Sequence, residues 1–261
     1  MVISFLSDFG LDDDFVGVCH GVIARIAPDA QVIDVTHGIA PQAVLQGAVV
    51  LASSLPYVPE GVHLAVVDPG VGSDRRAVAI RDREGRVFVG PDNGLLVPAA
   101  ERGGIEGAWA LENAAYRLER VSRTFHGRDV FAPAAAYIAT GVMPEELGPA
   151  LEPASLVRLE LPAAEIQEGE IRTIVLLVDR FGNAQLNVVA ADLERAGIAP
   201  GAQVEIGEHS ATVARTFADA PAGGLLLYED AYGRLALAIA GGNAAETLSI
   251  RVGDELTIAR T

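Results

Sequence analysis

The chain has 261 residues, half of them apolar, with 35 acidic and 19 basic residues and a formal net charge of −16. A half-apolar chain can bury a core, which excludes intrinsic disorder, and so negative a surface disfavours nucleic-acid and anionic-membrane partners. All basic residues are arginine, so Schiff-base lysines and P-loop phosphate binding are excluded. The single cysteine, Cys19, suits a reducing cytoplasm, and no signal peptide or membrane span is expected.

The first 160 residues alternate apolar, strand-like runs with helical patterns. Strands are predicted over residues 2–7, 31–35, 63–67, 77–81 and 86–90, and helices over residues 15–26, 41–55, 95–102 and 129–140. Apolar strands separated by helices are typical of a parallel or mixed sheet that is covered on both faces. The sequence therefore predicts the α/β class, with an N-terminal α/β/α sandwich domain over residues 1–160 and a mostly parallel sheet.

The pattern changes after residue 160. Residues 161–170 (LPAAEIQEGE) are acidic and contain Pro and Gly, which indicates a linker. Short β runs follow at residues 171–178, 203–206, 211–214, 225–228, 235–239 and 248–251. The turns between them are rich in Gly, Asp and Asn, which favours a small all-β barrel or sandwich as the C-terminal domain, residues 171–261.

Three polar clusters follow predicted strands or precede predicted helices in the N-terminal half. The segment SDFGLDDD (7–14) places Asp8 at the end of the first strand, although a solvated helix cap explains the same residues. In DPGVGSDRR (68–76) the third glycine of a dinucleotide-binding fingerprint is missing, and an ion pair holding the turn is an alternative. The third cluster, RTFHGRD (123–129), places a histidine at a helix start. Ligands of α/β domains gather at strand ends, so these clusters are candidate binding residues.

The C-terminal half adds a turn, DRFGN (179–183), at the end of a predicted strand. The asparagine amide matches the edge of adenine and the phenylalanine offers a stacking face, but a tight turn without ligand explains both. No nucleophile elbow or HExxH motif occurs, and the five histidines lack metal-ligand spacing, so no metal is expected. Those histidines are His20, His37, His63, His126 and His209.

Together the segments SDFGLDDDFVG, VVDPGVGSDRR, VFVGPDNGLL, RTFHGRDVFAPAAA, DRFGN and GGNAA resemble the S-adenosylmethionine hydroxide adenosyltransferases. These hydrolases are related to the enzymes that fluorinate and chlorinate S-adenosylmethionine. The resemblance implies an N-terminal α/β domain, a C-terminal β-barrel, and a homotrimer with active sites between subunits. It also implies S-adenosylmethionine as substrate and adenosine and methionine as products, with no cofactor.

The resemblance assigns roles residue by residue. The family's Asp, Arg and His at the nucleophile fall on Asp68, Arg75 and His126. Its ribose-binding aspartate falls on Asp8, and an acidic position for the methionine amine falls on Asp13. Further substrate-binding positions implied by the matching motifs are Phe9, Asn93, Phe181, Asn183, Tyr232, Asn243 and Ala244. The segment that often reads N-S-x-G in the family is DAYG (230–233) here, so no side chain is assigned to the methionine carboxylate.

These residues can support attack of water at C5′ of S-adenosylmethionine. The arginine stabilises developing hydroxide, and either Asp68 or His126 accepts the proton. Two alternatives stay open at this point. One is attack by a halide at the same carbon, which a nearby carboxylate opposes. The other is a non-catalytic sensor that binds adenosine or S-adenosylmethionine.

Overall fold

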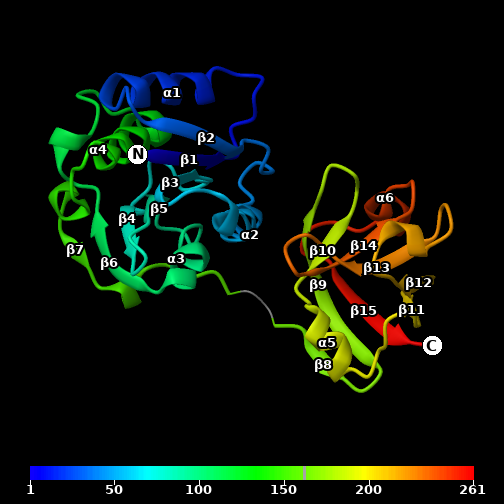
Figure 1. The fold of residues 1–261 in the computed structure, drawn as a ribbon. Coiled ribbons are helices and arrows are strands. Elements are labelled where there is room, and N and C mark those ends of the chain that lie inside the picture. The colour runs from blue at the N-terminus through cyan, green and yellow to red at the C-terminus, as the bar shows by residue number, and fades with distance from the viewer. Residues whose placement is uncertain (161–162) are drawn as a thin grey trace. The chain divides into compact units, whose positions relative to one another are not determined.

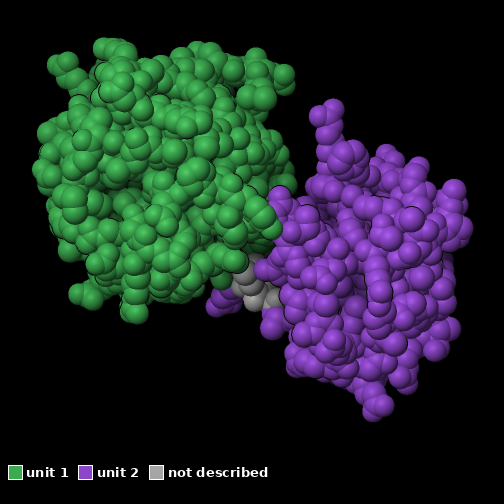
Figure 2. All heavy atoms as spheres, in the orientation of Figure 1, with its two compact units in different colours: residues 1–159 green, residues 160–261 purple. Residues whose placement is uncertain are grey.

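The computed structural model describes residues 1–160 and 163–261 (Figure 1). The chain divides into two compact units, Met1–Leu159 and Glu160–Thr261, which Figure 2 shows in separate colours. Within the described ranges no helix has the length and apolar character needed to cross a membrane.

Unit 1 is built on a seven-stranded sheet. Its strands are β1 (Val2–Ser7), β2 (Gln31–Thr36), β3 (Gly61–Val66), β4 (Ala77–Asp82), β5 (Val87–Pro91), β6 (Ile105–Ala110) and β7 (Ala150–Leu151), in the spatial order β2-β1-β3-β5-β4-β6-β7. The neighbours from β2 to β5 pair in parallel, whereas β4, β6 and β7 pair antiparallel. The sheet is therefore mixed rather than mostly parallel as predicted, with three parallel pairings at the β2 edge and three antiparallel pairings beyond β5.

Helices cover both faces of this sheet. They are α1 (Phe15–Ile26), α2 (Val44–Ser54), α3 (Val97–Gly103) and α4 (Ala132–Ala139). Because side chains alternate along a strand, Ile3 and Phe5 of β1 pack with α1 and α4, while Leu6 packs with α2 and α3. The predicted α/β/α class is confirmed.

The helix expected over residues 129–140 has an irregular start. A π-helical turn, Gly127–Phe131, precedes α4 and begins directly after His126. Such turns are rare inside helical segments and are frequent at functional sites. It places His126 at the amino end of this helical segment.

Unit 2 is a β-barrel with two short helices. Its elements are β8 (Glu165–Gln167), β9 (Glu170–Val178), β10 (Ala184–Leu186), α5 (Ala190–Arg195), β11 (Gln203–Ile206), β12 (His209–Val213), β13 (Leu225–Glu229), β14 (Leu235–Ile239), α6 (Ala244–Leu248) and β15 (Glu255–Arg260). The strands follow the order β10-β14-β13-β12-β11-β15-β9-β8, and β10 also pairs with β9. That last pairing closes seven strands into a ring, which confirms the predicted barrel, and β8 extends it at β9.

Unit 2 differs in several places from the pattern expected from the sequence, which did not predict β10, β15 or α5. The strand predicted over residues 248–251 is wrong, since Leu248 ends α6 and Ser249 adopts a left-handed φ of 54°. Asn243 starts that helix by accepting a hydrogen bond from the backbone of Glu246, 3.0 Å away, and this cap outweighs local β propensity. In the segment predicted as a linker, Glu165–Gln167 forms β8, while residues 161 and 162 lie outside the described residues.

Candidate active site

The three side chains expected at the nucleophile meet beyond the carboxyl end of β3. Nε of Arg75 lies 3.0 Å from each carboxylate oxygen of Asp68, and its Nη2 also donates to Asp68 Oδ2. The same Nη2 lies 2.9 Å from Nδ1 of His126. Only 11% of the Arg75 side chain and 6% of the Asp68 side chain are exposed. The guanidinium is thus a largely buried bridge between a carboxylate and an imidazole.

Two glycines shape the loop that returns Arg75 to Asp68. Gly72 has a φ of 79°, where other residues are strained, and a Cβ there would collide with a backbone carbonyl. A Cβ on Gly70 would lie 3.3 Å from Cγ of Arg75. Ser73 Oγ donates to the Gly70 carbonyl, 2.7 Å away, and accepts from the Arg75 amide at 3.3 Å. The two glycines of G-x-G therefore allow the tight turn that brings Arg75 back to Asp68.

His126 is held in a neutral form by its surroundings. Burial and the Arg75 guanidinium lower the pKa of His126 below its ordinary value. Because Arg75 carries only donors, Nδ1 of His126 accepts the hydrogen bond and the ring proton sits on Nε2. The following Gly127 has no room for a Cβ, which would lie 2.8 Å from the Phe9 ring. The His-Gly pair thus lets the two segments pack closely.

The neighbouring arginines divide into two roles. The Arg75 guanidinium lies 5.0 Å from the centre of the Phe131 ring, so an aromatic face supports it. Arg76 instead donates from Nε to the buried Asp92, 2.7 Å away, and from Nη1 to Ser155 Oγ at 3.1 Å. Arg76 therefore braces the fold, and Arg75 presents its charge to the candidate site.

Asp8 follows β1 and contacts the loop after β2. Its Oδ2 accepts a hydrogen bond from the backbone N–H of Gln42, 2.9 Å away. Gln42 has a φ of 66°, a conformation that is rare for glutamine. The loop is fixed a second time because the Gly10 amide donates to the His37 carbonyl at 2.8 Å. The carboxylate of Asp8 thus lies in a constrained position at the sheet's carboxyl edge.

Other predicted site residues of unit 1 have different surroundings. The Phe9 ring packs against three phenylalanine rings with centroids between 5.7 and 6.3 Å away. Asp13 is exposed in the segment before α1. The Asn93 amide donates to the Val67 carbonyl at 2.8 Å and accepts from the Leu95 amide at 3.2 Å. Asn93 therefore holds the chain next to Asp68, and its contact with substrate stays a prediction.

In unit 2 the turn DRFGN is organised by its first residue. Asp179 Oδ1 accepts from the backbone amides of Phe181 and Asn183 at 2.8 and 2.9 Å. Its Oδ2 accepts from the Asn183 side chain at 2.8 Å. The Phe181 ring is 75% exposed on top of this turn. The Asn183 backbone carbonyl accepts from the Asp179 amide at 2.9 Å, whereas its side-chain oxygen Oδ1 accepts no hydrogen bond among the described residues.

The same turn contacts the segment at the start of α6. A Cβ on Gly182 would collide with the Asn243 side chain, so only glycine permits this approach. The Gly182 carbonyl accepts from the backbone amide of Ala245 at 2.9 Å, next to the buried Ala244. Two motifs more than 55 residues apart in the sequence thus form one surface. Tyr232, on another turn of the barrel, is 55% exposed.

Two cavities lie beside the predicted site residues of unit 1. Arg75 and His126 line one of about 330 Å³ together with Arg117. Phe9 lines another, of about 540 Å³, with Phe15, Ser122, Thr124, Phe125 and Arg128. The Arg75–His126 pair and the aromatic cluster around Phe9 therefore each border a surface cavity.

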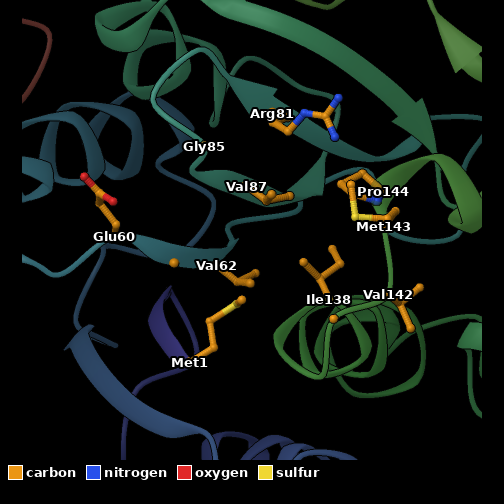
Figure 3. Close-up of a pocket in the computed structure, with 12 residues that line it drawn as sticks. Met1, Glu60, Val62, Arg81, Gly85, Val87, Ile138, Val142, Met143 and Pro144 are labelled. Carbon is orange, nitrogen blue, oxygen red and sulfur yellow. The ribbon is translucent and has the colours of Figure 1, made fainter.

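A third cavity, of about 380 Å³, lies elsewhere on unit 1 (Figure 3). Met1, Val62 and Val87 line it, and these residues stand at or next to the amino ends of β1, β3 and β5. Ligands of α/β domains bind at the carboxyl ends of parallel strands, so this cavity is on the wrong edge for the proposed chemistry.

Family models match both parts of the chain. The model of the S-adenosylmethionine (SAM) hydroxide adenosyltransferase N-terminal domain matches residues 3–148, and that of the C-terminal domain matches residues 173–257. The chain belongs to the SAM hydroxide adenosyltransferase family. The resemblance seen in the sequence motifs is thereby confirmed.

Individual relatives span the whole chain. An (R)-S-adenosyl-L-methionine hydrolase from Salinispora arenicola (strain CNS-205) is 49% identical over 257 residues, which cover 98% of this chain and 97% of the relative. A fluorinase from Actinopolyspora mzabensis is 28% identical and covers 100% of this chain and 97% of its own length. The crystal structure of an uncharacterized conserved protein from Thermotoga maritima is 36% identical, with a TM-score of 0.92 and coverage of 99% of this chain and 100% of that one.

Three residues at the candidate site were not predicted from the sequence. Gln42 donates to Asp8, Phe131 lies under Arg75, and Arg117 lines the same cavity as Arg75 and His126. Gln42 had no sequence signal, since its role rests on a backbone N–H. Phe131 lies five residues after His126 in the motif RTFHGRDVF, and this proximity was the one available clue.

Proposed function

We propose that this protein hydrolyses S-adenosyl-L-methionine to adenosine and L-methionine by attack of activated water at C5′. The observation that carries the proposal is the bridge in which one guanidinium contacts both Asp68 and His126. The 49% identity to an (R)-S-adenosyl-L-methionine hydrolase supports the same reaction. By that relationship the preferred substrate is the (R) sulfonium epimer.

The chemistry matches what these side chains can supply. The leaving group is the neutral sulfur of methionine, so no acid has to protonate it. Water is the difficult partner, because its pKa of about 15.7 makes hydroxide scarce at neutral pH. A permanently charged guanidinium lowers the cost of the developing hydroxide in an enclosed site. The proposed reaction uses no cofactor and no metal at the reacting carbon.

The hydrogen bonds favour Asp68 over His126 as proton acceptor. Nδ1 of neutral His126 already accepts from Arg75, and Nε2 carries the ring proton, so the imidazole has no free lone pair. The carboxylate of Asp68 offers about four acceptor sites, and only two Arg75 N–H groups, on Nε and Nη2, donate to it. We therefore assign proton acceptance to Asp68 and a positioning role to His126, which donates from Nε2.

This assignment predicts the acid limb of the pH profile. Protonated His126 loses its acceptor atom and repels Arg75, so kcat should fall as the pH drops through the pKa of His126. Since burial and then Arg75 lower that pKa, the midpoint of the fall should lie below the ordinary histidine value of about 6.5. His126→Asn keeps an acceptor for Arg75 but cannot titrate, and it should remove this limb. An unchanged limb in that variant would assign the titration to another group.

Substrate binding is proposed to involve both units. Asp8 binds the ribose hydroxyls, Asp13 the methionine amine, and the exposed Phe181 ring with the Asn183 side-chain oxygen Oδ1 binds adenine. Phe9, Asn93, Tyr232, Asn243 and Ala244 complete the proposed substrate contacts. These assignments follow family motifs, and the meeting of the DRFGN and Asn243–Ala244 segments supports the adenine part.

Asn183→Ala should weaken adenosine binding by about 1–3 kcal/mol, the cost of an unpaired buried partner. The asparagine contacts adenine in the ground and transition states alike, so KM should rise and kcat should change little. Steady-state kinetics with thermal unfolding of the same variant check this. A lower Tm with unchanged KM would limit Asn183 to bracing the turn on Asp179.

The assembly and location are part of the proposal. We infer a homotrimer whose sites form between the N-terminal domain of one subunit and the C-terminal domain of its neighbour. A reducing cytoplasm suits a chain whose single cysteine, Cys19, cannot form an internal disulfide. Burial raises the pKa of this thiol to about 12 and keeps it protonated. The acidic surface disfavours nucleic acid and membranes as partners.

The direct test incubates purified protein with separated (R) and (S) epimers and follows adenosine and methionine by chromatography. Adenosine formed from the (R) epimer at a higher rate supports the proposal, and no adenosine from either epimer would overturn it. Chloride or fluoride should yield no halogenated nucleoside, because the buried Asp68 carboxylate repels an incoming anion. Tight binding of S-adenosylmethionine without turnover would instead favour the alternative function, a non-catalytic sensor of adenosine or S-adenosylmethionine.

A further inference from the structure

A second cluster of polar side chains with potential metal-ligand atoms lies where α1 approaches β2. His20 belongs to α1, Asp34 to β2, and His37 to the loop after β2. Nε2 of His20 lies 2.8 Å from Asp34 Oδ1, and Nε2 of His37 lies 3.1 Å from the same oxygen. One ligand atom from each side chain lies within 4.8 Å of the other two. Three potential metal ligands from three segments therefore converge on one point.

His37, the buried member of this cluster, is held in its orientation by contacts with Phe5 and Ser7. The His37 side chain is 2% exposed, its ring packs edge-on against Phe5 at 4.7 Å, and its Nδ1 lies 2.7 Å from Ser7 Oγ. Nε2 of His37 makes no hydrogen bond among the described residues, although Asp34 Oδ1 is close. An unsatisfied buried nitrogen beside a carboxylate is costly, and a shared cation would remove that cost.

We propose that His20, Asp34 and His37 bind a divalent transition-metal ion of the zinc class. Imidazole nitrogens and a carboxylate oxygen are ligands that such ions take at about 2.0–2.2 Å, and a water can complete a tetrahedral site. The partly exposed His20 and Asp34 side chains, at 35% and 41%, let an ion enter from solvent. Ser7 holds the far nitrogen of His37, as partners of metal-bound histidines do.

The site is linked to the segment that carries Asp8. Ser7 Oγ accepts from the Phe9 amide at 3.2 Å, and the His37 carbonyl accepts from the Gly10 amide at 2.8 Å. A bound ion would therefore fasten α1 and β2 to the loop of residues 7–10. Its role is structural, and it involves none of the three residues proposed to activate water. Failure of the hydrolysis proposal would leave the metal proposal unaffected.

The test uses the full chain without an affinity tag, freed of metal by a chelator and titrated with Co²⁺. Visible absorption bands of a four-coordinate cobalt site should saturate at one ion per chain, and Zn²⁺ should displace them. A hundredfold excess of Zn²⁺ over its Kd should also raise Tm by about 5 °C or more. Absent cobalt bands would overturn the proposal, since contacts of the two imidazoles with Asp34 alone produce none.

Variants locate the ion. His20→Ala and Asp34→Ala should each weaken Zn²⁺ binding by about 100-fold or more, because even the partners of ligands cost 10–100-fold. Ser7→Ala should cost about tenfold, since it removes only the partner of His37. His209→Gln is the matched control, because His209 is an exposed histidine in the barrel, and its affinity should equal that of the unmodified chain.

The partly exposed ring of His20 makes His20→Ala the decisive variant if Asp34→Ala fails to fold. Equal Zn²⁺ affinities in His20→Ala and His209→Gln would overturn the proposed site, even if a cobalt spectrum is observed.

Discussion

Arg75→Ala should lower kcat by about 10²–10³-fold, the usual cost of one charge-stabilising donor in an enclosed site. The guanidinium acts on charge that develops on the attacking oxygen, so the loss belongs to the transition state. Adenosine carries no such charge, and its affinity should therefore change little. Single-turnover rates together with calorimetric titration of adenosine measure the two effects separately.

Three companion variants separate catalysis from packing. Arg75→Lys keeps the charge but cannot place separate donors on Asp68 and His126 at once, so it should recover only part of the rate. Asp68→Asn combined with Arg75→Ala removes the unpaired buried charge and should restore stability without restoring kcat. Arg76→Ala should mainly lower the free energy of unfolding, by about 2 kcal/mol, because it leaves the buried Asp92 carboxylate without its arginine partner. Near-normal kcat in a folded Arg75→Ala protein would remove Arg75 from the mechanism.

Local patterns predicted much of the fold because most strands are short apolar runs bounded by turns. The strand predicted over residues 2–7 agrees with β1 at both ends. By contrast β6 was missed, since Gly107 interrupts its pattern. A Cβ there would collide with the Trp109 ring, so the glycine makes room for a large side chain on the same strand. The sequence alone does not show where the Trp109 ring lies, so the reason for a glycine within this strand could not be predicted.

The site could be predicted as clusters but not as contacts. The carboxyl ends of parallel strands lie at one edge of an α/β sheet, so the sequence predicted that Asp8 and Asp68 belong to the same site. The donor that Gln42 offers to Asp8 is a backbone N–H, and no side-chain pattern reports it. Likewise His20 and His37 are 17 residues apart along the chain, a spacing with no local meaning. Only the approach of α1 to β2 brings them to one carboxylate.

Asp8→Ala should raise KM and lower kcat, with kcat/KM reduced about 100-fold or more. A carboxylate that binds two ribose hydroxyls contributes about 1.5–3 kcal/mol per hydrogen bond and also positions C5′ in line with the water. The structure adds a second consequence, since removal of Oδ2 releases the Gln42 amide. Steady-state kinetics and adenosine titration measure the effect of Asp8→Ala. Control variants must separate the loss of ribose binding from the loss of the hydrogen bond that holds the Gln42 loop.

Two substitutions provide those controls. Asp8→Asn keeps an oxygen for the Gln42 N–H but loses the charge, so its kcat/KM should lie between those of Asp8→Ala and the unmodified protein. Gln42→Gly keeps the N–H and suits the left-handed φ of 66°, so it should leave kinetics nearly unchanged and stabilise the loop. If Asp8→Ala bound adenosine normally, the carboxylate would serve only to hold the loop at Gln42. If Gln42→Gly instead matched the losses of Asp8→Ala, the Gln42 side chain, rather than the carboxylate, would bind the ribose.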